Sequence, residues 1–407
     1  MSEAVVVAAT RTPIGRAFKG SLAQVRPDAL AAAAVRAALE AVPELDPADL
    51  DDLYLGCAEP WGEQGMNLAR IVAVLLGHDH LPAVTVNRFC ASSVQTTRMA
   101  FHAIRAGEGE AFVSAGVECV SRYPGFSGAG QGNEEWLNPV FADARARTEQ
   151  YRLTNEPWTD PREAGNLPDA YLAMGQTAEH VANLRGVSRQ AQDEWAVTSQ
   201  QRAEKATLDG FFAREITPVT TPDGRVVDRD DSPRAGVTLE AVQSLQPVFR
   251  AGGTVTAGNC CPLNDGAAAL VVMSDRKAQE LGITPLARVV ATGVSALSPE
   301  IMGLGPVEAS RRALANAGMT IADLDLVEIN EAFAAQVLPS ADELGIDYDR
   351  LNVHGGAIAL GHPFGSTGAR ITTTLLNGLR ARDGQFGLET MCVGGGQGMA
   401  IIFERLS

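Results

Sequence analysis

Apolar residues recur along the chain at two different spacings. Residues 28–41 carry apolar side chains at helical spacing, and residues 52–56 form a short apolar segment typical of a strand. The same helix and strand patterns return over residues 307–317, closed by Gly318, and over residues 325–329. The N-terminal and C-terminal parts of the chain therefore share one local pattern.

A second set of segments follows the same order in both parts. The N-terminal set comprises a strand over 83–87, a turn at Cys90, a helix through Arg105 and a strand over 111–116. The C-terminal set comprises a strand over 351–353, a glycine-rich turn around His362, a helix through Arg380 and a strand over 388–393. Ordered correspondence of this kind predicts two copies of one β/α unit packed against each other in an α/β fold.

The repeat divides the chain into three parts. Residues 1–121 together with 251–275 are predicted to form the first half, and residues 276–407 the second. The more polar residues 122–250 are interpreted as an inserted loop or lid domain.

The segment that leads back from this insert has its own pattern. We expect a strand at 255–257, an Asn-Asp-Gly turn at 264–266 and a buried strand over 267–273. The buried strand should return the chain to the first half.

Charge and composition argue against several classes of function. The chain has 33 Lys and Arg against 49 Asp and Glu, a formal net charge of −16, and no basic block of the kind that binds nucleic acid. No apolar stretch approaches the ~18 residues of a membrane span, and no basic leader precedes an apolar core. We therefore expect a cytoplasmic protein that binds neither nucleic acid nor membranes.

The six cysteines form no Cys-x-x-Cys pair, and no histidine lies near them at zinc-ligand spacing. We predict free thiols and no metal site. Cys57, Cys119 and Cys260 are interpreted as buried packing residues.

Cys90 and His362 occupy matching turns of the two repeats, each just before its own helix. Both should then face one crevice between the halves. A thiol at a helix N-terminus experiences the positive end of the helix dipole, which favours the thiolate, and a nearby imidazole would accept its proton. From these two residues alone, a Cys/His hydrolase is as conceivable as an acyltransferase.

Two further residues end strands next to candidate turns. Cys392 precedes three glycines whose backbone N–H groups could hold an oxyanion, and its thiol is a candidate acid or base. Asn330 follows the strand over 325–329, at the end where α/β sheets place ligands. Asn330 either orients a water molecule or caps the next helix.

Seven motifs in order resemble those of thiolases. They are Arg11-Thr12-Pro13-Ile14-Gly15, Val86-Asn87-Arg88-Phe89-Cys90, Thr256-Ala257-Gly258-Asn259, Asn264-Asp265-Gly266-Ala267-Ala268, Asn330-Glu331-Ala332-Phe333, Gly355-Gly356-Ala357-Ile358-Ala359-Leu360-Gly361-His362-Pro363 and Cys392-Val393-Gly394-Gly395-Gly396. The resemblance implies a five-layer α-β-α-β-α fold built from two βαβαβαββ halves, with a loop domain inserted in the first.

The resemblance also implies a role for each site residue. Cys90 would be the nucleophile that becomes acylated, His362 would take its proton, and Cys392 would shuttle the proton at the acetyl α-carbon. Asn330 would hold a water that forms one oxyanion hole with His362. The backbone N–H groups of Cys90 and Gly394 would form the second.

Coenzyme A is the co-substrate that the resemblance implies, with no prosthetic group. Because coenzyme A is polyanionic and the chain is acidic, local cations must hold its phosphates, and Arg234 is the candidate. The resemblance also assigns contacts with coenzyme A to Met174, Ala257, Cys261 and Phe333. The resemblance further implies assembly as a homodimer or homotetramer.

Departures from the family pattern bear on the subtype. Ala173 replaces the histidine of a His-Met-Gly motif usual in biosynthetic thiolases, and Ser93 replaces a glycine. Both changes favour a degradative 3-ketoacyl-CoA thiolase of fatty acid β-oxidation. Cys261, at a position often occupied by serine, and His354, at one often occupied by asparagine, leave the chain length open. A biosynthetic acetoacetyl-CoA thiolase and a non-catalytic thiolase-like acyl-CoA or lipid-binding protein remain alternatives.

Overall fold

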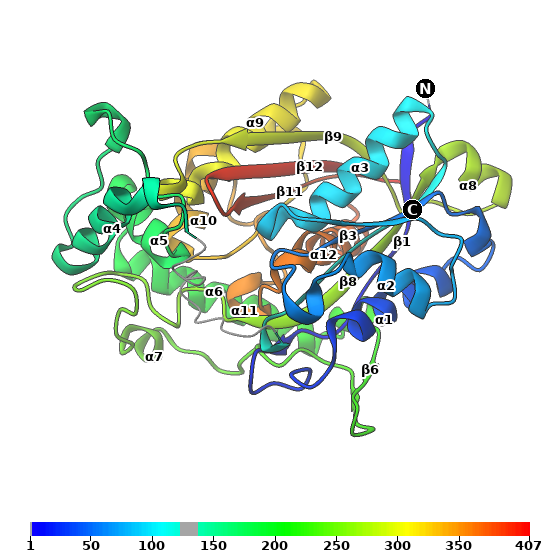
Figure 1. Ribbon diagram of the computed structural model, residues 1–407, viewed down its shortest axis with the longest axis horizontal. Helices are drawn as coiled ribbons and strands as arrows, with labels where there is room; N and C mark the ends of the chain where they lie inside the picture. Colours follow the sequence, from blue (N-terminus) through cyan, green and yellow to red (C-terminus); the bar gives the residue numbers. More distant parts are fainter. Residues whose placement is uncertain (1, 123–136) are drawn as a thin grey trace.

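Strands from both ends of the chain form one long sheet (Figure 1). The structure is a computed structural model and describes residues 2–122 and 137–407. The N-terminal strands follow the order β4 (Ala83–Val86), β3 (Asp52–Gly56), β5 (Ala111–Cys119), β8 (Asn264–Ser274) and β1 (Ala4–Arg11), with β2 (Gly15–Arg16) paired to β8. The C-terminal strands continue in the order β9 (Ala287–Ala296), β12 (Gln397–Arg405), β11 (Phe386–Val393) and β10 (Leu326–Ile329). The two sets join where Val5 and Val6 of β1 pair with β9.

Both strand sets have the same pattern of directions. β3 lies parallel to β4 and β5, and β10 lies parallel to β11, whereas the remaining neighbours in each set are antiparallel. This common order confirms the predicted repeat. The counterpart of β4 is reduced to one parallel bridge between Leu351 and Val327, so the strand predicted over 351–353 is wrong in extent.

Helices lie on both faces of each strand set. α1 (Pro27–Glu40) and α2 (Leu68–Leu75) cover the outer face of the N-terminal strands, and α9 (Gly305–Ala317) and α10 (Ala334–Leu344) cover that of the C-terminal strands. α3 (Ser92–Ala106) and α12 (Thr367–Arg382) share a core with the inner faces of both sets. The layers therefore alternate α-β-α-β-α, which confirms the fold that the resemblance implied.

The central helices α3 and α12 touch at their first turns. A Cβ atom at Gly368 would lie 2.4 Å from a methyl carbon of Val94, so glycine is required for this approach. Ser93 Oγ accepts a hydrogen bond from the backbone N–H of Ala369 at 3.0 Å. Because the two helix starts meet, the turns that precede them also come together.

Residues between β5 and β8 form the inserted part. Its helices are α4 (Ala142–Thr154), α5 (Met174–Arg185), α6 (Arg189–Leu208) and α7 (Leu239–Gln243), and its short strands β6 (Val219–Thr220) and β7 (Val226–Val227) pair with each other. Figure 1 shows α4, α5 and α7 at the end of the molecule opposite α8 (Asp275–Leu281). α5 packs on α10, and α6 packs on α11 (Ala357–Leu360). The predicted domain boundaries at 121, 250 and 275 stay a prediction, and residues 123–136 lie outside the described residues.

Two predictions for the segment that enters β8 are wrong. Residues 255–257 contain a single bridge, at Thr256, and no strand. Residues 264–266 do not turn but begin β8. The turn propensity of Asn-Asp-Gly is overridden because the side chains of Asn264 and Asp265 are fully buried and hydrogen-bonded to partners distant in sequence.

Within the described ranges, no helix combines the length and the apolar character that a bilayer crossing requires.

Candidate active site

Cys90 lies in a tight turn between β4 and α3. Asn87 Oδ1 accepts a hydrogen bond from the N–H of Phe89 at 2.8 Å, and Ser92 Oγ accepts one from the N–H of Arg88 at 2.9 Å. Phe89 has a φ of +43°, a conformation that residues with a side chain rarely adopt. The structure therefore contains the abrupt turn that the sequence predicts, and the turn places the Cys90 thiol at the N-terminus of α3.

The surroundings of the Cys90 thiol favour its neutral form. Burial raises its pKa to about 12, although the backbone N–H groups of Cys90 itself and of Gly394 point at the sulfur and lower the pKa. Desolvation therefore outweighs the helix dipole, which the sequence analysis expected to favour the thiolate. The two N–H groups are the pair predicted to form an oxyanion hole.

His362 is held by three hydrogen bonds. Its backbone N–H donates to Asn264 Oδ1 at 2.9 Å, Nδ1 lies 2.7 Å from Thr367 Oγ1, and Nε2 lies 3.2 Å from Asn330 Nδ2. Thr367 Oγ1 also lies 3.0 Å from the carbonyl oxygen of Pro363, to which it donates. It therefore accepts from Nδ1–H, which assigns the proton to Nδ1 and leaves Nε2 as the basic nitrogen.

Burial also sets the charge of His362. Desolvation, together with the nearby Arg370 guanidinium, lowers the pKa of His362 to about 3. The imidazole is neutral near pH 7 and can accept a proton. Thiol and imidazole therefore rest as a neutral pair, with the proton on sulfur.

Gly361 and Asn264 fix the loop in front of His362. Gly361 has a φ of +112°, and a Cβ atom there would lie 2.6 Å from the Asn264 amide. Asn264 Nδ2 donates to the carbonyl oxygen of Gly15 at 3.0 Å. The Asn-Asp-Gly motif thus positions the His362 loop, a role that turn statistics could not indicate.

Glu118, near the end of β5, ties together loops from both halves. Its Oε2 accepts hydrogen bonds from the N–H groups of Ala58 at 2.9 Å and Gly365 at 2.8 Å, and its Oε1 accepts one from Gln64 Nε2 at 2.7 Å. Burial raises the pKa of Glu118 to about 7 against the effect of these donors. The sequence gives no signal for this role, since the partners lie far apart along the chain.

Glu331 holds the other end of the His362 loop. Its Oε2 accepts hydrogen bonds from the N–H of Ile358 at 3.1 Å and from Ser199 Oγ at 2.6 Å, and its Oε1 accepts one from Asn352 Nδ2 at 2.8 Å. Glu331 belongs to a motif that the sequence singled out, but only its neighbour Asn330 was given a role. The loop is therefore clamped by a buried carboxylate on each side.

Cys392 and Asn330 border the same site. Cys392 is the last residue but one of β11 and is fully buried, and burial together with the nearby Cys90 raises its pKa. Asn330 Oδ1 is buried and has no hydrogen-bond partner among the described residues. The alternative that Asn330 caps a helix is wrong, because α10 begins after Phe333 and has no side-chain cap.

A cavity of about 410 Å³ surrounds the Cys90 thiol. Both reacting side chains line it, together with four other residues that the sequence singled out: Met174, Cys261, Phe333 and Gly394. Cys392 packs in the apolar cluster behind Cys261 and Phe333. The structure therefore brings together the predicted nucleophile, base and second thiol.

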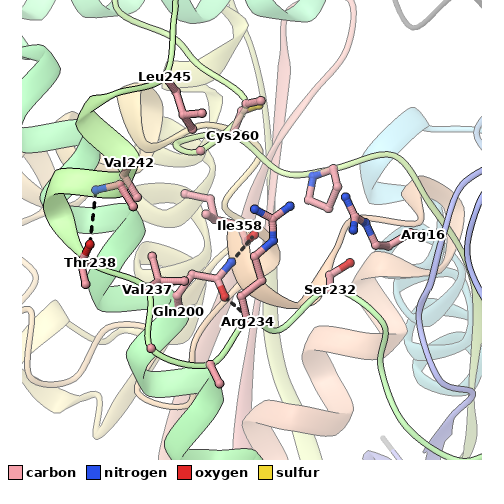
Figure 2. A pocket seen from close by; sticks show the side chains of 16 residues that line it. Arg16, Gln200, Ser232, Arg234, Val237, Thr238, Val242, Leu245, Cys260 and Ile358 are labelled. Atoms are coloured by element: carbon pink, nitrogen blue, oxygen red, sulfur yellow. Dashed lines mark hydrogen bonds between the residues drawn. The ribbon is translucent and has the colours of Figure 1, made fainter.

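A second cavity, of about 310 Å³, adjoins the first. Arg16, Arg234 and Ala257 line it, and Figure 2 shows the side chains of Arg16 and Arg234 extending into it. Cys260 packs against a buried apolar cluster, as predicted, and it also lines both cavities, which was not predicted. Arg16 was missed, although it directly follows the motif that ends at Gly15.

Two family models match almost the whole chain. The model of the thiolase N-terminal domain matches residues 4–276, and that of the thiolase C-terminal domain matches residues 283–405. The chain belongs to the thiolase family.

Individual thiolases match over their full length. A 3-ketoacyl-CoA thiolase of Pseudoalteromonas translucida is 43% identical, and a β-ketoadipyl-CoA thiolase of Acinetobacter baylyi is 41% identical, each with 100% of both chains covered. The crystal structure of the Bacillus anthracis acetyl-CoA acetyltransferase superposes with a TM-score of 0.87 at 38% identity, covering 100% of this chain and 99% of the other. This structural similarity agrees with the α-β-α-β-α layers described above.

Across residues 2–122 and 137–407, no group of three His, Cys, Asp or Glu side chains is placed to hold a metal ion. The absence of a metal from the reaction stays a prediction.

Proposed function

We propose that this chain is a 3-ketoacyl-CoA thiolase, which cleaves a 3-ketoacyl-CoA with coenzyme A into acetyl-CoA and a shortened acyl-CoA. The observation that carries the proposal is that Cys90 and His362 line one cavity and that Cys392 is buried in the apolar cluster next to it, within electrostatic reach of Cys90. The curated relatives named 3-ketoacyl-CoA thiolase support the same direction.

The proposed reaction begins with attack of the Cys90 sulfur on the ketone carbon at C3. His362 Nε2 takes the thiol proton as the carbon–sulfur bond forms. The C2–C3 bond then breaks, and its electron pair leaves on the enolate of acetyl-CoA. Cys392 donates the proton that converts this enolate to acetyl-CoA, and the shortened acyl group stays on Cys90.

The second half of the proposed reaction returns the enzyme to its starting state. The thiol of coenzyme A attacks the carbonyl carbon of acyl-Cys90, and the Cys392 thiolate takes its proton. The carbon–sulfur bond to Cys90 breaks, and His362 returns the proton to the departing sulfur. Two cysteines are needed because the acyl carrier cannot also protonate the enolate.

Two sets of donors stabilise the oxygens that become negative. We assign the first to His362 and a water held by Asn330, whose buried Oδ1 lacks a partner among the described residues. We assign the second to the backbone N–H groups of Cys90 and Gly394, which point at the sulfur. Removing one such donor typically costs ~10²–10³ in rate.

Coenzyme A is proposed to reach Cys90 through the adjoining cavities. Arg16 and Arg234 would hold its phosphates at the outer cavity, and Ala257 would lie along its path. Met174, Cys261 and Phe333 would contact the part nearest the thioester. No prosthetic group is proposed.

The proposed setting is β-oxidation in the cytoplasm, where a homodimer or homotetramer acts. The free cysteines suit a reducing compartment. Exposed apolar side chains of α2 and β4, among them Leu75 at 54% and Val84 at 37% exposure, suit burial against a second copy. The alternatives, a biosynthetic thiolase and a non-catalytic lipid-binding protein, are not favoured by the names of the relatives.

Thiolysis assays with ketoacyl-CoA substrates of four, eight and sixteen carbons test the degradative assignment. The proposal predicts coenzyme-A-dependent cleavage of chains longer than four carbons. A strict preference for the four-carbon substrate would instead assign the biosynthetic reaction, and cleavage of simple esters without coenzyme A would identify a hydrolase.

A further inference from the structure

The cavity around Cys90 has one charged side chain among its described lining residues, and it is a carboxylate. Glu59 lines the cavity, and no lysine or arginine does. The other walls are mainly apolar or aromatic, among them Leu172, Phe249 and Met302. Residues 123–136, outside the described part, contain no lysine or arginine in the sequence either.

Hydrogen bonds fix Glu59 close to the nucleophile. Its backbone N–H donates to Glu118 Oε1 at 3.3 Å, and its Oε2 accepts from Trp61 Nε1 at 2.9 Å. The negative charges of Glu118 and Glu59 both raise the pKa of the Cys90 thiol, which places these carboxylates within electrostatic reach of the reacting sulfur. An acyl chain that extends from Cys90 along this wall therefore meets a negative potential.

Sequence identity alone does not show which acyl chain this protein accepts. Relatives named for 3-ketoacyl-CoA and for β-ketoadipyl-CoA match this chain at 43% and 41%. A β-ketoadipyl chain ends in a carboxylate, and burying a carboxylate requires a partner cation or several hydrogen-bond donors. Arg16 and Arg234 line the adjoining cavity and not this one.

We propose that Glu59 is a specificity-determining residue that excludes acyl chains ending in a carboxylate. The substrates are then 3-ketoacyl-CoA thioesters with an uncharged chain. This inference rests on the proposed thiolase function. The physical basis is repulsion between two carboxylates in a poorly solvated cavity, combined with the desolvation of a charge that finds no partner there.

Two substrates of equal chain length test the proposal directly. Wild-type protein is assayed with 3-oxohexanoyl-CoA, which ends in a methyl group, and with 3-oxoadipyl-CoA, which ends in a carboxylate. We expect kcat/KM to favour the methyl-ended substrate by about 100-fold or more. The methyl ester of 3-oxoadipyl-CoA separates charge from size, and it should be cleaved far better than the free acid.

The variant Glu59→Gln keeps the shape of the side chain and removes its charge. We expect this variant to reduce the ratio of kcat/KM for the methyl-ended substrate to kcat/KM for 3-oxoadipyl-CoA about tenfold, chiefly through faster cleavage of 3-oxoadipyl-CoA. Glu63→Gln is the matched control, because Glu63 lies in the same loop, pairs with Arg122 at 2.7 Å and does not line the cavity. This control should keep the wild-type preference.

The outcomes separate this inference from the proposed function. Equal cleavage of both substrates by wild-type protein, or an unchanged preference in Glu59→Gln, would overturn the role of Glu59 while leaving a thiolase. Failure of wild-type protein to cleave either substrate with coenzyme A would contradict both the thiolase function and the inference that depends on it.

Discussion

At the scale of single residues, burial decides the chemistry of the site. Burial raises the pKa of the Cys90 thiol and lowers the pKa of the His362 imidazole, because desolvation disfavours both the thiolate and the imidazolium. In the proposed reaction, the proton therefore moves from sulfur to nitrogen only as the substrate is attacked. The residue types were evident from the sequence, but the charge state was not, because it depends on depth in the folded molecule.

Alkylation of Cys90 by iodoacetamide tests this charge state. With a pKa raised to about 12, the thiolate fraction increases about tenfold per pH unit between about pH 6 and about pH 10. The alkylation rate, followed by peptide mapping, should rise with the same slope. A rate that levels off near pH 8 would show that the thiol is far more acidic than its burial implies.

At the scale of elements, two buried carboxylates position the reacting turns. Glu118 joins a loop after β3 to the loop that follows His362, and Glu331 holds the segment that precedes His362. These contacts connect residues that are far apart in the sequence. Glu118 and Gly365, for example, are separated by 247 positions. No local sequence pattern predicts such pairs.

The variant Glu118→Gln should impair catalysis more than binding. Its amide presents an N–H₂ group to N–H donors, so one loop loses its acceptor. We expect kcat to fall about 10- to 100-fold, with a smaller change in KM for the ketoacyl substrate. Glu110→Gln, at a half-buried position just before β5, is the control.

A pH profile distinguishes positioning from general destabilisation. Because the pKa of Glu118 is raised to about 7, its ionised fraction falls as the pH drops below about 7, and the acylation rate of wild-type protein should fall with it. Glu118→Gln should lack this titration. An identical acid limb in both proteins would assign the titration to another group.

Local signals predicted the regular elements well. The helix expected over 28–41 is α1, the helix closed by Gly318 is α9, and the buried strand expected over 267–273 lies within β8. Predictions failed at 255–257 and 264–266, where buried hydrogen bonds and pairing with distant strands override local propensity.

At the scale of the whole molecule, a protein with a net charge of −16 must bind a co-substrate that is itself polyanionic. The outer cavity provides a local exception, because Arg16 and Arg234 both line it. Arg16 precedes the insert in the sequence and Arg234 lies within it, so only the fold shows that they share a site.

Neutralising this arginine pair should weaken binding of coenzyme A without impairing the chemical steps. Arg16→Ala and Arg234→Ala are each expected to raise KM for coenzyme A about 3- to 10-fold, and the double variant more, with kcat nearly unchanged. Arg36→Ala, on the outer helix α1, is the control. If the double variant has the wild-type KM, the phosphates bind elsewhere.

In the proposed reaction, Cys90 carries the acyl group. Intact mass spectrometry after incubation with acetoacetyl-CoA, with peptide mapping to locate the adduct, measures this directly. We expect a single acetyl adduct on Cys90 that coenzyme A removes, and no adduct in Cys90→Ser. An acetyl adduct that persists in Cys90→Ser would show that another residue carries the acyl group.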